Sequence, residues 1–198
     1  MPSVFLSPSV QEFNPYIIGG NEEYYMNLIA DAIEPFLDAS GIIHGRNNPN
    51  ETLRQAIDKS NAGNYELHVS IHSNASPPAL SGQLRGVDIY FSPNSFYGRE
   101  FANILQNNFR NIYPDPSLVN IVPTTTLAEV RLTNAPAVLI EVAYHDNELD
   151  AQWIVTHINE IAEMIALSIT EYFGVPFVAP IRNEDDFVVY NLIIWQKV

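Results

Sequence analysis

Short apolar runs alternate along this chain with longer segments that carry an apolar residue at every third or fourth position. The short runs predict strands at residues 4–6, 42–43, 65–71, 86–91 and 137–140. The longer segments predict helices at residues 22–37, 52–61, 95–112 and 151–173. Strands that alternate with helices favour an α/β fold, a three-layer sandwich with a mixed, largely parallel central sheet flanked by helices.

The chain has 198 residues, a length that suits one well-buried domain better than two. We place that domain at residues 1–178. Residues 179–198 are predicted to form a C-terminal tail, because a stretch with two prolines at 175–181 is followed by a strongly apolar stretch at 187–195. An added edge strand, a partner-binding segment and a homodimer through this tail all remain open.

The composition limits which partners the chain can bind and which residue types could hold a metal. Nine Lys and Arg residues stand against 23 Asp and Glu, a net charge of −14, which argues against a nucleic-acid partner. No apolar run reaches the roughly 18 residues that span a bilayer, so no membrane span is expected. The N-terminus lacks the pattern of a signal peptide, which leaves the export route open. Without cysteine, a metal would need His, carboxylate or amide ligands, and zinc is the natural choice.

Two polar side chains come at the ends of predicted strands. His72 closes the apolar run at residues 67–72, and Glu141 follows the run at residues 137–140. Because the carboxyl ends of neighbouring strands meet at one edge of an open α/β sheet, an imidazole and a carboxylate could converge there. A metal-dependent hydrolase would use such a pair. An ordinary hydrogen-bonded histidine and a solvated carboxylate are the alternatives.

Three motifs together resemble a known family, the zinc-dependent N-acetylmuramoyl-L-alanine amidases often called the amidase 3 family. They are Ser-Ile-His-Ser-Asn-Ala at residues 70–75, Arg131 ahead of Pro-Ala-Val-Leu-Ile-Glu at residues 136–141, and Asn147 shortly after that glutamate. The resemblance covers about residues 3 to 178. Each motif alone would be weak, whereas the combination is specific.

The resemblance implies a peptidoglycan hydrolase that acts at the cell wall or outside the cell. Its reaction would be the cleavage of the amide bond between N-acetylmuramic acid and L-alanine of the stem peptide by zinc-activated water. His72 matches the second zinc-binding histidine of the family, and Glu141 matches its catalytic glutamate. Glu23 matches the glutamate at the start of the first helix, because Asn27 and Leu28 follow it at the family's spacing.

The first zinc-binding histidine of the family has no counterpart here. Residues 6–12 read Leu-Ser-Pro-Ser-Val-Gln-Glu, and Gln11 is the best substitute in that stretch. An amide oxygen is a poorer zinc ligand than imidazole, so the substitution bears on metal affinity rather than on the fold. His145 comes four residues after Glu141 and is expected to complete the zinc site, donate a proton or contact the substrate. The predicted catalytic residues are Glu141 and His145, and the predicted metal ligands are Glu23, His72 and Gln11.

Arg131 and Asn74 are predicted to bind the substrate. Arg131 would pair with a substrate carboxylate, and a structural ion pair is the alternative for it. His68 is predicted to be buried and hydrogen-bonded, since the backbones of His68 and His72 lie about 13 Å apart on one strand and one metal cannot take both.

Two other functions remain open. A metal-free, amidase-like module that binds the cell wall would explain the missing histidine, whereas the retention of Glu23, His72 and Glu141 together favours an enzyme. A zinc carboxypeptidase on a related α/β frame would use similar ligands on a different bond.

Overall fold

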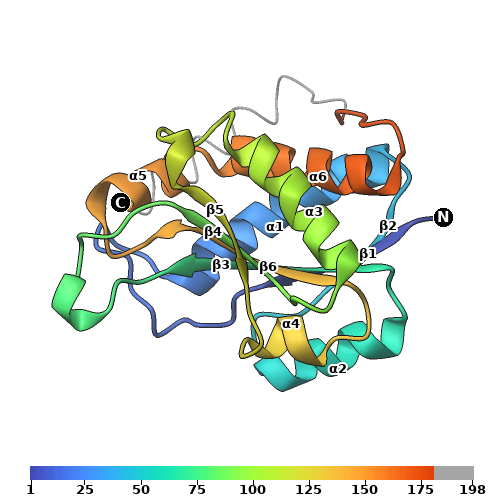
Figure 1. Cartoon of the computed structure of the whole chain (residues 1–198), viewed down its shortest axis with the longest axis horizontal. Coiled ribbons are helices and arrows are strands. Elements are labelled where there is room, and N and C mark those ends of the chain that lie inside the picture. Colours follow the sequence, from blue (N-terminus) through green and yellow to red (C-terminus); the bar gives the residue numbers. More distant parts are fainter. Residues whose placement is uncertain (181–198) are drawn as a thin grey trace.

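The computed structural model describes residues 1–180, whose strands form one six-stranded sheet (Figure 1). The strands are β1 (Ser3–Pro8), β2 (Ile43–Arg46), β3 (Leu67–Asn74), β4 (Val87–Phe91), β5 (Val119–Pro123) and β6 (Ala137–Tyr144). The helices are α1 (Glu22–Ala39), α2 (Leu53–Gly63), α3 (Phe96–Phe109), α4 (Ala128–Leu132), α5 (Glu148–Thr156) and α6 (Ile158–Phe173), with short 3-10 helices at Pro78–Leu80 and Pro116–Leu118.

The sheet is mixed but mostly parallel, in the order β2-β1-β3-β6-β4-β5. Strands β2, β1, β3 and β6 run parallel to one another, whereas β4 runs antiparallel to β6 and parallel to β5. Because β1, β3 and β6 are neighbours and point the same way, the loops after them meet at one edge of the sheet. The prediction of an α/β fold with a mixed, largely parallel sheet is confirmed.

Helices cover both faces of the sheet, which explains the continuous apolar runs in its central strands. Helices α1, α3 and α6 lie on one face, and α2 and α4 lie on the other (Figure 1). Strand β6 is therefore apolar and buried from Ala137 to Ile140, as expected for a strand between two helical layers. The aromatic side chains of Phe5, Phe101 and Phe109 are fully buried in this core, and each contributes about 1.5–3 kcal/mol by leaving water.

The structure corrects the predicted elements in three places. The single helix predicted at residues 151–173 is two helices, because His157 leaves the helical conformation (φ −120°, ψ 22°) between α5 and α6. Strands β3 and β6 each extend past the predicted end, to Asn74 and Tyr144, so His72 and Glu141 lie within strands. Strand β5 and helix α4 were missed, since five residues are too few to show a period.

The end of the described chain packs back on the first helix. Helix α6 ends at Gly174, whose left-handed conformation (φ 65°) suits a helix C-terminus. Phe177 then stacks on Phe36 of α1, with 5.5 Å between ring centroids, and the backbone N–H of Val178 donates to the Ser40 hydroxyl. The homodimer contact predicted through residues 179–198 falls mostly outside the residues that the structure describes. The division between a domain at residues 1–178 and a C-terminal tail stays a prediction.

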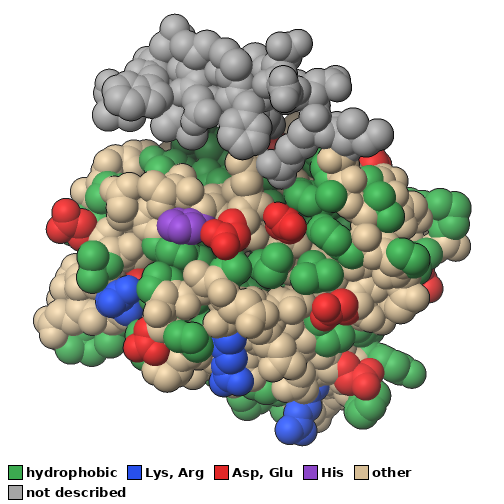
Figure 2. Space-filling model, turned by 90° about the horizontal axis from the view of Figure 1, so that it is seen from above, with side chains coloured by type: hydrophobic (Ala, Val, Ile, Leu, Met, Phe, Trp, Pro, Cys, Tyr) green, Lys and Arg blue, Asp and Glu red, His purple; other side chains and the backbone are tan. Residues whose placement is uncertain are grey.

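The surface of the described residues agrees with the acidic composition. On the face in Figure 2, acidic side chains are scattered among apolar and other side chains, and the few Lys and Arg side chains form no continuous patch. No helix within residues 1–180 combines the length and apolar character that crossing a bilayer requires.

Candidate active site

The candidate site lies at the carboxyl ends of β1, β3 and β6, beside the first turn of α1. His72 of β3 is in register with Glu141 of β6, and Glu141 is in register with Asp88 of β4. The loop between β1 and α1 carries Gln11, and its Ser9 N–H donates to the carbonyl of Ile71, which holds the loop against β3. The sheet thus brings side chains from four segments to one place.

His72 lies between two carboxylates, with only 7% of its surface exposed. Its Nδ1 is 2.9 Å from Oε1 of Glu22, and its Nε2 is 3.0 Å from Oε2 of Glu129. The side-chain amide of Gln11 is 3.3 Å from the same Nδ1. Asn14 completes this side of the ring, since its amide donates to both Glu22 and Gln11. The imidazole is therefore fixed through both nitrogens.

Electrostatics make the three groups interdependent. Burial alone would lower the pKa of His72, but hydrogen bonds to Glu129 and Glu22 outweigh burial and hold that pKa well above its usual 6.5. Burial alone would raise the pKa of Glu129 and Glu22, yet the bonds to histidine hold both below the usual value for a glutamate. Without a bound cation, the stable form is an imidazolium between two carboxylates.

Glu141 differs from the other carboxylates because it has no hydrogen-bond partner for Oε2. That atom is inaccessible to water, and it has no partner within residues 1–180. Burial raises the pKa of Glu141 to about 7; nearby His72 offsets part of the rise, and the charges of Glu22, Asp88 and Glu129 add to it. A carboxyl with a pKa near neutrality, next to a candidate metal ligand, suits a general base.

The raised pKa of Glu141 predicts a pH-dependent stability for the metal-free protein. The folded state keeps the Glu141 proton up to about pH 7, whereas the unfolded chain releases it near 4.5, so folding loses stability as pH rises through that window. The loss is on the order of 2–3 kcal/mol and is complete above pH 7. Glu141→Gln stays neutral, so relative to wild type it should gain that amount between pH 4.5 and pH 8 in chelator, as measured by urea unfolding.

A matched control separates this effect from ordinary charge removal. Glu100→Gln takes away an exposed carboxylate on α3 and should change the free energy of unfolding about equally at the two pH values. An equal change at both pH values for Glu141→Gln would contradict the raised pKa.

The structure places Glu22, rather than the predicted Glu23, against His72. Glu22 is 1% exposed, whereas Glu23 points to the side of α1 where it accepts a hydrogen bond from Asn27. Consecutive helical residues point about 100° apart, so only one of two adjacent glutamates can face the sheet. Both follow the helix cap, where the Asn21 side chain accepts from the N–H of Tyr24.

His145 and Asn74 lie beside the site, and their roles in catalysis and substrate binding stay predictions. His145 is 4% exposed, and its Nδ1 is 3.0 Å from both the hydroxyl and the carbonyl of Ser73, the residue after His72. Its ring stacks on Tyr16, with 5.3 Å between centroids. The backbone N–H of His145 donates to the carbonyl of Asn74. This arrangement leaves Nε2 of His145 for any further partner.

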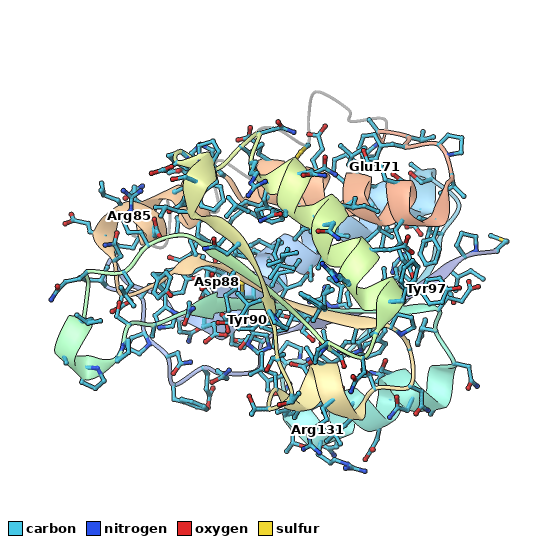
Figure 3. The ribbon with its side chains drawn as sticks, viewed as in Figure 1. Arg85, Asp88, Tyr90, Tyr97, Arg131 and Glu171 are labelled. Atoms are coloured by element: carbon cyan, nitrogen blue, oxygen red, sulfur yellow. The ribbon has the colours of Figure 1, made fainter. Side chains whose placement is uncertain are left out.

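Arg131 is exposed on α4, and no hydrogen bond or ion pair of its side chain occurs within the described residues. It extends at the lower margin of the molecule in Figure 3, whereas Asp88 and Tyr90 lie over the middle of the sheet. The structural ion pair considered for Arg131 is therefore not seen in residues 1–180. Its contact with a substrate carboxylate stays a prediction.

Asn147 and Asp146 organise the loop that follows β3. Asn147 caps α5 by accepting from Leu149 and Asp150, and its amide donates to the carbonyl of Gly82. Asp146 accepts from the backbone N–H groups of Ser76 and Gly82. The short Tyr-His-Asp-Asn sequence after β6 thereby fixes the loop at residues 75–86 beside the site.

Glu129 was missed by the sequence analysis, although it contacts His72 directly. It is 3% exposed and lies in the five-residue helix α4, ahead of β6. A single acidic residue in a short, partly apolar segment is normally exposed, so a buried glutamate was not expected there. The only signal in the sequence is its position between Ala128 and Val130, two apolar residues.

The donor atoms around Nδ1 of His72 fit a zinc ion in part. Within residues 1–180, no three His, Asp or Glu side chains form a ready metal cluster. Glu22 Oε1 and the Gln11 amide nevertheless lie 2.9 and 3.3 Å from this nitrogen, close to the roughly 3.3 Å between ligands of a tetrahedral zinc with bonds of about 2.0 Å. Rotating the side-chain amide of Gln11 would turn its oxygen towards the metal. Glu129, at Nε2 of His72, is the kind of carboxylate to which metal-binding histidines commonly donate their second N–H. The carboxylate of Glu22 and the imidazole of His72 therefore fit zinc as they stand, whereas the Gln11 amide fits only after this rotation, because its oxygen now accepts from Asn14.

Comparison with known proteins identifies the family of this chain. Residues 15–171 match the family model described as N-acetylmuramoyl-L-alanine amidase. The chain therefore belongs to the N-acetylmuramoyl-L-alanine amidase family, and peptidoglycan hydrolysis is the activity that this membership supports. The search of curated proteins finds no match.

Solved amidase structures share the fold at low sequence identity. The catalytic domain of CwlV, an N-acetylmuramoyl-L-alanine amidase from Bacillus (Paenibacillus) polymyxa var. colistinus, is similar over 89% of this chain and 100% of its own, with 23% identity and a TM-score of 0.75. An N-acetylmuramoyl-L-alanine amidase from Clostridium difficile 630 is similar over 87% and 97%, with 16% identity and a TM-score of 0.76. AmiC2 of Nostoc punctiforme is similar over 87% and 97%, with 18% identity and a TM-score of 0.75.

Proposed function

We propose that this chain cleaves the amide bond between N-acetylmuramic acid and the L-alanine of the stem peptide, with a zinc ion held by Glu22, His72 and Gln11. The observation that carries the proposal is the convergence of the Glu22 carboxylate and the Gln11 amide on Nδ1 of His72. Family membership supports the substrate, peptidoglycan, and hence action at the cell wall or outside the cell.

A bound zinc would supply a Lewis acid for the scissile carbonyl and lower the pKa of a bound water. Residues of the chain carry out the proton transfers. The Glu141 carboxylate accepts a proton from the attacking water and delivers it to the nitrogen of the leaving L-alanine as the C–N bond breaks. A carboxyl with a pKa near 7 can both take and return that proton at neutral pH.

The walls of the site orient the substrate. The loop at residues 75–86 is fixed by Asp146 and Asn147, so it forms a rigid border on one side. His145, held by Ser73 and stacked on Tyr16, presents Nε2 as a contact for the stem peptide. Asn74 at the end of β3 is the second proposed contact, and Arg131 the third, through a substrate carboxylate.

One observation favours the rival function, a metal-free module that binds the cell wall. Both nitrogens of His72 are already hydrogen-bonded to carboxylates, so the side chains are mutually satisfied without a cation. The two functions differ in product: the enzyme releases a peptide with a free L-alanine amino group, whereas the module binds peptidoglycan and releases nothing.

Digestion of purified peptidoglycan separates these functions. The zinc-loaded protein is expected to release stem peptides that begin with L-alanine, identified by mass spectrometry and by labelling of new amino termini. Release of a free amino acid, with the shortened stem peptides still attached to the glycan, would point to the carboxypeptidase. Binding to peptidoglycan without any release would contradict the proposed amidase.

A further inference from the structure

Glu129 connects two buried histidines that lie four residues apart on β3. Its Oε2 is 3.0 Å from Nε2 of His72, and its Oε1 is 3.5 Å from Nε2 of His68 and accepts a hydrogen bond from the Ser7 hydroxyl. His68 is fully buried and hydrogen-bonded at both nitrogens, by Ser60 and Ser70. The prediction that His68 is buried and hydrogen-bonded is confirmed.

We infer that Glu129 is a positioning residue: it accepts a hydrogen bond from Nε2 of His72 and so holds the ring with Nδ1 facing Glu22 and Gln11, where the lone pair of Nδ1 would bind zinc. The inference rests on the proposed function and extends it to a residue that touches neither zinc nor substrate. A histidine that binds metal through one nitrogen commonly donates the other N–H to a carboxylate, which fixes the tautomer and strengthens the ligand.

The surroundings of Nε2 of His72 are more enclosed than those of Nδ1, which favours Nδ1 as the nitrogen that faces the metal. On the Nε2 side, Ser7, Glu129 and His68 are 2%, 3% and 0% exposed. The cavity there, lined by Ser9 and Asn47 among others, measures about 10 Å³, room for one water at most. On the Nδ1 side, Gln11 is partly exposed. Gln11 thus makes the Nδ1 side the less enclosed of the two.

The surroundings of Glu129 explain why its carboxylate can hold a fixed orientation. Ser7 comes from β1, His72 from β3 and Glu129 from α4, so three elements meet at one carboxylate. The hydroxyl of Thr133 donates to the carbonyl of Glu129, which also fixes the backbone of this short helix. A carboxylate held in this way cannot rotate away from His72 without leaving Ser7 unpaired.

The test measures the zinc affinity of folded protein by competition with a chromophoric chelator. Glu129→Gln keeps an acceptor oxygen and nearly the same shape but lacks the charge, and it is expected to weaken zinc binding by about 10- to 100-fold. Glu141→Gln serves as the matched control, because Glu141 is not a proposed ligand and its loss should stop hydrolysis without weakening zinc binding. Circular dichroism of each variant confirms folding.

A spectroscopic measurement on the wild type keeps the inference testable even where Glu129→Gln does not fold. The ¹⁵N shifts of zinc-loaded protein should show His72 coordinated through Nδ1 and protonated at Nε2. Coordination through Nε2, or an unchanged zinc affinity in folded Glu129→Gln, would overturn the role of Glu129 and leave the proposed amidase intact. A wild type that binds no zinc would overturn the zinc mechanism and this inference with it.

Discussion

Replacing Glu141 with Gln is expected to lower the rate of muramoyl-peptide hydrolysis by about 10²- to 10⁴-fold, while zinc remains bound. A positioned general base contributes a factor of this size, and glutamine cannot take a proton from water. Burial raises the pKa of Glu141 to about 7, which suits a group that accepts a proton at neutral pH. The rate of hydrolysis is measured from the appearance of free L-alanine amino groups. Bound zinc is measured by elemental mass spectrometry.

A second substitution tests whether position as well as charge matters at residue 141. Glu141→Asp keeps the carboxylate but draws it back by one methylene, so it should fall between wild type and Glu141→Gln. The exposed-site control, Glu100→Gln, should hydrolyse at the wild-type rate. Hydrolysis by Glu141→Gln at more than about a tenth of the wild-type rate would show that another group accepts the proton.

Exchanging the two adjacent glutamates of α1 for glutamine should separate their roles. Glu22→Gln is expected to weaken zinc binding by more than about 100-fold, because it removes a charged ligand that lies 2.9 Å from Nδ1 of His72. Glu23→Gln should change zinc affinity by less than about threefold, since its carboxylate turns to Asn27 instead. Both affinities are read from competition with the same chelator.

The pair is its own matched control, because both variants lose one carboxylate from the same helical turn. A general loss of charge near the site would weaken zinc binding by similar amounts in the two variants. Equal losses, or a larger loss in Glu23→Gln, would show that the metal is not held by the glutamate that faces His72.

The carboxylates around His72 make the ionised form of Glu141 unfavourable. Glu22, Asp88 and Glu129 all raise the pKa of Glu141, which means that their charges repel it. A divalent cation at Nδ1 of His72 would offset this repulsion, so zinc should stabilise the folded protein in proportion to the logarithm of its concentration. Within residues 1–180, however, the proposed zinc site has no ready-formed cluster of three His, Asp or Glu ligands.

The sequence was sufficient for the fold and for the two side chains at the centre of the site. Short apolar runs and longer segments of period three to four located five of the six strands and the major helices, since these patterns follow from burial against two helical layers. His72 and Glu141 were found because both lie in the apolar strands that form the middle of the sheet.

The remainder of the site depends on three-dimensional contacts that spacing does not encode. Spacing to Asn27 could not choose between Glu22 and Glu23, because the choice depends on which side of α1 faces β3. Glu129 could not be found at all, since α4 is too short to reveal its buried face and the contact with His72 spans 57 positions of the chain. The break at His157 was likewise invisible, because apolar residues continue on both sides of it.

The most direct test of the zinc amidase is to titrate metal-free protein with zinc while measuring the release of L-alanine amino groups from a muramoyl peptide. Hydrolysis should be absent in chelator, rise with added zinc and level off near one zinc per chain. Full activity in excess chelator would contradict the metal mechanism. No hydrolysis at any zinc concentration, with intact binding to peptidoglycan, would contradict the enzyme itself and favour the binding module.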